Sequence, residues 1–181
     1  MSPTIAAGLF LLRLVFGLTV AAHGAQKLFG WFGGPGLEGF GGFLEQLGIA
    51  PASRWSWAAA LAEFGGGLLV VLGLLSPLGN FLVIGAMLTA ILVVHLPKGF
   101  FNAQGGIELP FLIASGILGL SITGPGSWSL DALWQVRLPE PGTWLVCAFL
   151  TLLGVGAALW RRGYARGADT GTRAGHVRSE S

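Results

Sequence analysis

The chain has 181 residues, of which 53% are hydrophobic and only 10% are charged. A soluble domain carries about 25% charged residues, so the composition predicts an integral membrane protein and excludes an ordinary soluble enzyme. The formal net charge is +2, and five of the ten Lys and Arg residues lie in the last 21 positions. That basic stretch is too short for a nucleic-acid interface, so no nucleic-acid partner is expected.

Five apolar segments are long enough, or nearly so, to cross a hydrocarbon core of about 30 Å. They cover about residues 5–28, 55–75, 80–96, 107–123 and 143–160. The first four predict a four-helix membrane domain at residues 5–134, and the fifth is an additional helix. The remaining residues 161–181 are rich in Gly, Arg, Ser and Thr, which predicts a basic, disordered tail.

The first segment carries three polar side chains on roughly one side of its helix. Arg13 lies well inside the segment, and His23 and Lys27 lie four residues apart at its end. Positions i and i+4 share a helix face. Ionisable residues at membrane depth are costly and usually have a partner or a function. This face is therefore expected to point into the bundle.

Residues 31–50 break the apolar pattern. Hydrophobic residues recur there at helical spacing, while Glu38 and Glu45 lie off that stripe. This pattern predicts a short amphipathic helix that lies in the membrane interface.

The second segment has small residues at Ala58, Ala62 and Gly66, a spacing that favours close helix packing. Glu63 lies beside them, two turns into the segment. A carboxylate at that depth needs a cation, a proton or a hydrogen-bonding ligand.

The third and fourth segments add a histidine and a carboxylate around one polar loop. His95 lies at the end of the third segment, before Pro97, and Glu108 lies in the first turn of the fourth. The single cysteine, Cys147, lies in the fifth segment and excludes an intramolecular disulfide or a CxxC redox pair.

Alternating helix directions bring four of these helix ends to one side of the membrane. The side chains expected to gather there are His23, Lys27, Glu63, His95 and Glu108, with Arg13 deeper. Three interpretations remain open for this cluster. Lys27 with Glu63, and His95 with Glu108, could simply clasp neighbouring helices; the cluster could bind a small molecule such as a quinone; or His23, Glu63, His95 and Glu108 could bind zinc or iron.

Orientation follows from the positive-inside rule. With five spans and the N-terminus outside, Lys27, Arg54, Lys98 and the tail arginines lie inside, and Arg137 lies outside. We therefore expect an N-out, C-in topology with the cluster facing the cytoplasm.

Several short motifs in order resemble those of the DoxX family of small bacterial membrane proteins. They are residues 12–17 (LRLVFG), His23-Gly24 followed by residues 27–30 (KLFG), residues 62–66 (AEFGG), His95, Gly106-Ile107-Glu108 and residues 126–131 (GSWSLD). The resemblance covers about residues 9–133 and implies a four-helix membrane fold in a bacterial plasma membrane. The fifth segment, the basic tail and an N-terminus without positive charge depart from the family pattern.

The resemblance also implies a role in membrane redox complexes, since relatives include a subunit of a thiosulfate:quinone oxidoreductase and parts of an oxidant-defence complex. We therefore expect a quinone-linked redox component, or the membrane subunit of an oxidoreductase, with quinone as cofactor. Expected partners are the lipid bilayer, soluble redox subunits and a second copy of the chain. The alternative is a non-enzymatic scaffold or assembly factor. A transporter has less support, because no internal repeat is evident and the cluster lies near one interface.

Overall fold

The computed structural model describes the backbone of residues 1–179 and the side chains as far as Trp160, together with that of Arg162. The described chain is all-helical. Its α-helices are α1 (Pro3–Phe29), α2 (Gly36–Gln46), α3 (Ala52–Leu72), α4 (Ser76–Ala90), α5 (Glu108–Thr123), α6 (Leu130–Leu133) and α7 (Gly142–Ser179). Helix α4 continues through a π-helical turn, Ile91–His95, and a short 3-10 turn, Leu96–Lys98. The predicted fold class, an all-α membrane bundle, is confirmed.

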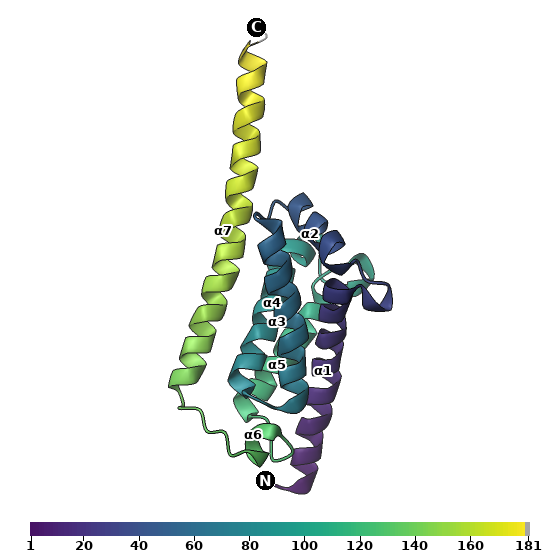
Figure 1. Cartoon of the computed structure of the whole chain (residues 1–181), viewed down its shortest axis with the longest axis vertical. Coiled ribbons are helices and arrows are strands. Elements are labelled where there is room, and N and C mark those ends of the chain that lie inside the picture. Colours follow the sequence, from purple (N-terminus) through teal and green to yellow (C-terminus); the bar gives the residue numbers. More distant parts are fainter. Residues whose placement is uncertain (180–181) are drawn as a thin grey trace.

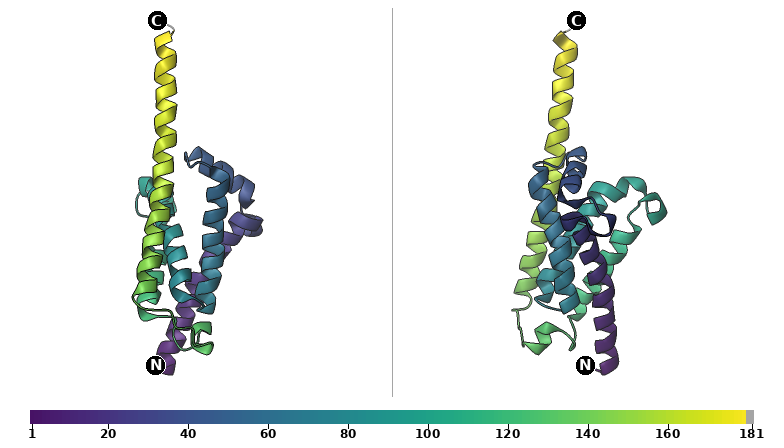
Figure 2. Two further views of the ribbon diagram at one scale, coloured as in Figure 1. Left: turned by 60° about the vertical axis from the view of Figure 1, so that its left-hand side comes forward. Right: turned by 45° about the vertical axis from the view of Figure 1, so that its right-hand side comes forward.

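The five long helices run in alternating directions (Figure 1). Helix α2 and the loop between α4 and α5 lie at one end of the bundle, called the α2 end below. The α3–α4 turn, α6 and the N-terminus lie at the opposite end, called the α6 end (Figures 1 and 2). Lys27, Arg54 and Lys98 are therefore grouped at the α2 end, and Arg137 follows α6 at the other end.

Four helical stretches are long and apolar enough to cross a membrane: Pro3–Phe29, Ala52–Leu72, Ser76–Lys98 and Gly142–Trp160. Helix α5 has 16 residues, which span about 24 Å at 1.5 Å per residue. It matches the fourth predicted segment, about residues 107–123, and is shorter than the four stretches above, although it runs through the bundle beside them. Leucine and phenylalanine side chains cover the outer surface, including Leu11 and Leu18 of α1 and Phe111 of α5, as expected for a surface in contact with lipid.

Helices α1 and α3 pack closely through glycines. A Cβ atom placed on Gly67 would lie 2.6 Å from the backbone nitrogen of Ala21, and one on Gly17 would lie 2.8 Å from the carbonyl oxygen of Gly67. Small residues at such contacts let two backbones approach. The small residues of α3 that were predicted to pack closely on another helix have different neighbours. Gly66 packs on α4, whereas Ala58 and Ala62 line a cavity.

The predicted amphipathic helix is α2. It buries Phe40 and Leu44 against Ile49 and Val93, while Glu38 and Glu45 stay exposed. Its position in a membrane interface stays a prediction. The helix covers the end of the bundle where the polar side chains were expected to gather.

Helix α7 begins at Gly142, close to the predicted start at residue 143, and its backbone continues as helix to Ser179. Its candidate membrane span is Gly142–Trp160, which matches the additional transmembrane helix predicted at residues 143–160. The side chains of residue 161 and of residues 163–181 lie outside the described part of the chain. A disordered tail in solution therefore stays a prediction.

Candidate functional site

Four of the six predicted side chains line one cavity near the α2 end. His23 and Lys27 reach it from α1, Glu63 from α3 and His95 from the end of the α4 helix. The cavity has a volume of about 820 Å³, within the range of about 300–1,000 Å³ typical of small-molecule sites. The convergence inferred from alternating helix directions is therefore seen for these four residues.

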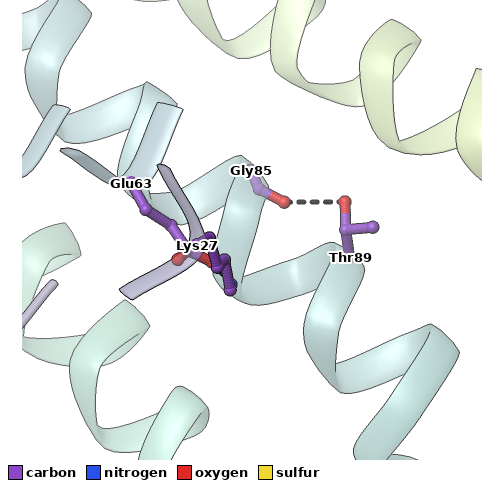
Figure 3. A network of polar contacts seen from close by, with 4 residues as sticks. All are labelled: Lys27, Glu63, Gly85 and Thr89. Carbon is purple, nitrogen blue, oxygen red and sulfur yellow. Dashed lines mark hydrogen bonds and ion pairs between the residues drawn. The ribbon is translucent and has the colours of Figure 1, made fainter. Parts of the chain in front are cut away.

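Lys27 and Glu63 form an ion pair between α1 and α3, in which the Lys27 ammonium donates to Oε1 of Glu63 (Figure 3). The side chain of Glu63 is 3% exposed and that of Lys27 is 24% exposed. The Nζ of Lys27 also lies 4.8 Å from the ring centroid of Phe40 on α2, a favourable position for a cation. Oε2 of Glu63 is buried and has no hydrogen-bond partner among the described residues.

The two histidines differ in their surroundings. Nδ1 of His95 lies 2.6 Å from the carbonyl oxygen of Gly105. Because a carbonyl oxygen only accepts, Nδ1 carries the proton, and Nε2 of the neutral ring is left as an acceptor. His23 is exposed at the cavity lining. The cavity therefore has one histidine held in a defined tautomer and one that is not fixed by a described hydrogen bond.

Glu108 is not part of the cavity lining, contrary to the prediction. Its Oε2 accepts a hydrogen bond from the backbone N–H of Asn102 at 2.8 Å. It therefore stabilises the loop before its own helix, and no clasp with His95 forms. Asn102 lines the cavity instead, and Glu108 contacts the backbone of this lining residue.

Arg13 lies far from the cavity, which corrects its assignment to the cluster. Fourteen residues of helix separate Arg13 from Lys27, which places them about 21 Å apart along α1 even though they share a face. The Arg13 side chain is 2% exposed, and its Nη2 donates to the carbonyl oxygen of Trp128 near the α6 end. Its role is to join α1 to the segment before α6.

Asp131 is a buried carboxylate that is not among the site residues predicted from the sequence. It accepts hydrogen bonds from the backbone N–H groups of Leu75 (2.8 Å) and Ser76 (3.0 Å), and from the Ser76 hydroxyl (2.7 Å). It thus caps the N-terminus of α4 from a position more than fifty residues later in the chain. The motif at residues 126–131 contained Asp131, but no local signal shows that it caps α4.

The proposed metal ligands do not assemble. Within the described residues, no group of three His, Cys, Asp or Glu side chains lies close enough to hold a metal ion. Glu63 is engaged by Lys27 and Glu108 by the Asn102 backbone. The metal interpretation of the cluster is therefore wrong for this geometry.

The rest of the cavity wall is largely apolar and comes mainly from five helices, α2, α3, α4, α5 and α7. Its residues include Phe40 and Phe43 of α2, Trp55, Ala58 and Ala62 of α3, Phe81 and Met87 of α4, Pro110 and Ile113 of α5, and Cys147, Leu150 and Gly154 of α7. An apolar cavity with a few convergent polar groups is the usual form of a binding site for a small organic molecule.

The fold is that of a small helical membrane protein, and His23, Lys27, Glu63 and His95 line a largely apolar cavity inside it. The sequence matches the DoxX family over residues 8–96, and the chain belongs to this family. The matched region contains His23, Lys27, Glu63 and His95. Helices α5 and α7 lie outside it.

Two relatives extend the match. The uncharacterised membrane protein Rv3486 of Mycobacterium tuberculosis is 33% identical over 143 residues, which cover 72% of this chain and 83% of that protein. The "Putative oxidoreductase CatD" of Bacillus subtilis is 28% identical over 131 residues, which cover 72% of this chain and 90% of that protein. No solved structure matches the chain.

Proposed function

We propose that this protein binds a quinone in the cavity at the α2 end and acts as a quinone-linked redox component in the bacterial plasma membrane. The observation that carries the proposal is the combination of an apolar cavity of about 820 Å³ with a lysine–glutamate pair and two histidines in its lining. A quinone has the matching chemistry, since it is an apolar ring with two carbonyl oxygens that accept hydrogen bonds.

The side chains supply both recognition and proton transfer. The Lys27 ammonium has three donors and uses one on Glu63, so it can also donate to a quinone carbonyl. Reduction to the quinol takes up two electrons and two protons. Glu63 and His23 are the groups placed to pass these protons, and a soluble redox subunit is the proposed source of the electrons. The name of the Bacillus subtilis relative, an oxidoreductase, supports a redox role.

The orientation is part of the proposal. Lys27, Arg54 and Lys98 lie at the α2 end and Arg137 at the α6 end, and by the positive-inside rule this distribution supports a cavity that faces the cytoplasm. A cytoplasmic redox subunit then docks at the α2 end, where its electrons reach the bound quinone.

The test is quinone binding by the purified full-length protein in lipid nanodiscs. Glu63→Gln removes the anion that holds the Lys27 ammonium, and His23→Ala removes a polar side chain of the cavity lining. Each is expected to weaken binding by about tenfold, or ~1.4 kcal/mol. Glu45→Gln is the matched control, because Glu45 is an exposed glutamate of α2 outside the cavity. Wild-type affinity in both cavity variants would contradict this site.

A second candidate function is a non-enzymatic scaffold. The observation that favours it is that Lys27 and Glu63 join α1 to α3, so the pair can serve only to hold the bundle together. In that case the same substitutions lower thermal stability, no quinone binds, and a soluble protein co-purifies with the chain in mild detergent.

A further inference from the structure

The cavity is long, and its charged and histidine side chains lie toward one end. Leu78 and His95 both line it and lie 17 residues apart on the helical stretch Ser76–Lys98, which corresponds to about 25 Å along the helix axis. Lys27 and His95 lie toward the α2 end, whereas the lining near Leu78 and Phe81 is apolar. Such a cavity matches an amphiphile that has a polar headgroup and a long apolar chain.

One side of the cavity opens on the outer surface of the bundle. Several lining side chains are also exposed: Phe43 of α2 is 40% exposed, Leu78 of α4 is 43% exposed and Leu150 of α7 is 59% exposed. Ala58 of α3 and Gly154 of α7 are likewise exposed lining residues. We call the surface formed by Ala58, Leu78, Leu82, Leu150 and Gly154 the α3–α7 groove.

The floor of this groove is α4, and α3 and α7 pack on either side of it. Thr151 of α7 donates a hydrogen bond to the carbonyl oxygen of Phe81 at 3.2 Å, and the rings of Phe81 and Trp144 meet edge to face at 5.1 Å. A Cβ atom on Gly85 would lie 3.1 Å from Thr151. These contacts hold α7 against α4, beside which it runs in Figure 1. Residues of both α3 and α7 line the cavity, and the groove is the part of the cavity between these two helices.

The groove faces the hydrocarbon of the bilayer. Ala58 and Gly154 lie within the spans Ala52–Leu72 and Gly142–Trp160, and the five residues of the groove include no charged side chain. A polar ligand would lose its hydration there without replacement hydrogen bonds, whereas an apolar chain loses nothing.

We propose that the α3–α7 groove holds the isoprenoid tail of the quinone and admits the quinone sideways from the bilayer, with its headgroup at Lys27 and Glu63. This proposal rests on the proposed function and specifies its substrate class as long-tailed, membrane-resident quinones. Helix α7 forms one wall of the groove and lies outside the family match at residues 8–96. The fifth long helix is thus a part of the binding site rather than only an anchor.

The test compares two ligands, a benzoquinone without a tail and the same benzoquinone with a long isoprenoid tail, in nanodiscs with empty discs as the partition blank. Gly154→Leu narrows the groove, and a Cβ atom at Gly154 meets nothing within 4 Å, so the fold accepts it. Gly156→Leu is the matched control, since Gly156 is also exposed and open but does not line the cavity. Ala58→Leu narrows the groove from the opposite wall.

Gly154→Leu and Ala58→Leu are expected to weaken binding of the tailed quinone by about tenfold, or ~1.4 kcal/mol. Both variants should bind the tail-less quinone with wild-type affinity. The control variant Gly156→Leu should bind both quinones with wild-type affinity. Wild-type affinity for the tailed quinone in both groove variants would overturn the groove and leave the headgroup site intact. If neither quinone binds the wild-type protein, the proposed function itself falls, and the groove assignment falls with it.

Discussion

Gly24 of α1 lies against the backbone of Phe64 of α3. A Cβ atom placed on Gly24 would lie 2.3 Å from the Phe64 nitrogen and 2.6 Å from its Cα atom. These distances are too short for any side chain, so the two helices must separate if Gly24 is replaced. The contact lies one turn from Lys27 and next to Glu63, and it therefore fixes the position of both partners of the ion pair.

Replacing Gly24 with Ala is expected to destabilise the protein by about 1–3 kcal/mol, the usual cost of overpacking. The measurement is the unfolding transition in mild detergent. Gly8→Ala is the control on the same helix, because a Cβ atom there meets nothing within 4 Å. Equal stability of the two variants would show that α1 and α3 can move apart without cost.

The Lys27–Glu63 pair is tested by a double-mutant cycle. Lys27→Met leaves the buried Glu63 carboxylate without its cation and is expected to cost about 3–5 kcal/mol. Adding Glu63→Leu removes that carboxylate, so the double variant should regain most of the lost stability. The readout is again the unfolding free energy. Simple additivity of the two single changes would show that the pair is not coupled.

Asp131 is expected to contribute to the stability of the fold and not to ligand binding. Asp131→Ala leaves the N–H groups of Leu75 and Ser76 without their acceptors, and each buried unsatisfied group costs about 1–3 kcal/mol. Ser76→Ala removes only the hydroxyl contact and should cost about 1 kcal/mol. Thermal unfolding is the measurement, and Asp131→Ala should lower the unfolding temperature more than Ser76→Ala. Quinone binding at saturating ligand should not change in either variant.

The orientation predicts opposite labelling of the two ends. In a Cys147→Ser background, Gln135→Cys at the α6 end should react with a membrane-impermeant thiol reagent in intact spheroplasts. Ser53→Cys at the α2 end should react only after the membrane is opened. Both positions are exposed. The reverse pattern would place the cavity on the outer side of the membrane.

The sequence by itself determined the helices and the end of the bundle at which the site lies. Apolar runs of membrane length form helices because hydrocarbon cannot satisfy free backbone groups. Alternating directions then bring His23, Lys27, Glu63 and His95 to one side, whatever the details of packing. The amphipathic pattern around Phe40 and Leu44 likewise fixed α2, because helical periodicity is a local property of the chain.

Only the tertiary structure decided which polar residues belong together. Arg13 shares a helix face with Lys27 but lies about 21 Å from it along the helix axis. Its guanidinium therefore donates to the carbonyl oxygen of Trp128 and does not reach the cavity. Glu108 begins the helix that follows His95 in the chain. Its carboxylate nevertheless accepts a hydrogen bond from the backbone of Asn102 in the adjoining loop. No sequence pattern predicted that α7 lines the cavity. An apolar helix has the same residue pattern whether it faces lipid or a cavity. Contacts between segments distant in sequence depend on how helices pack, and composition and periodicity do not record that packing.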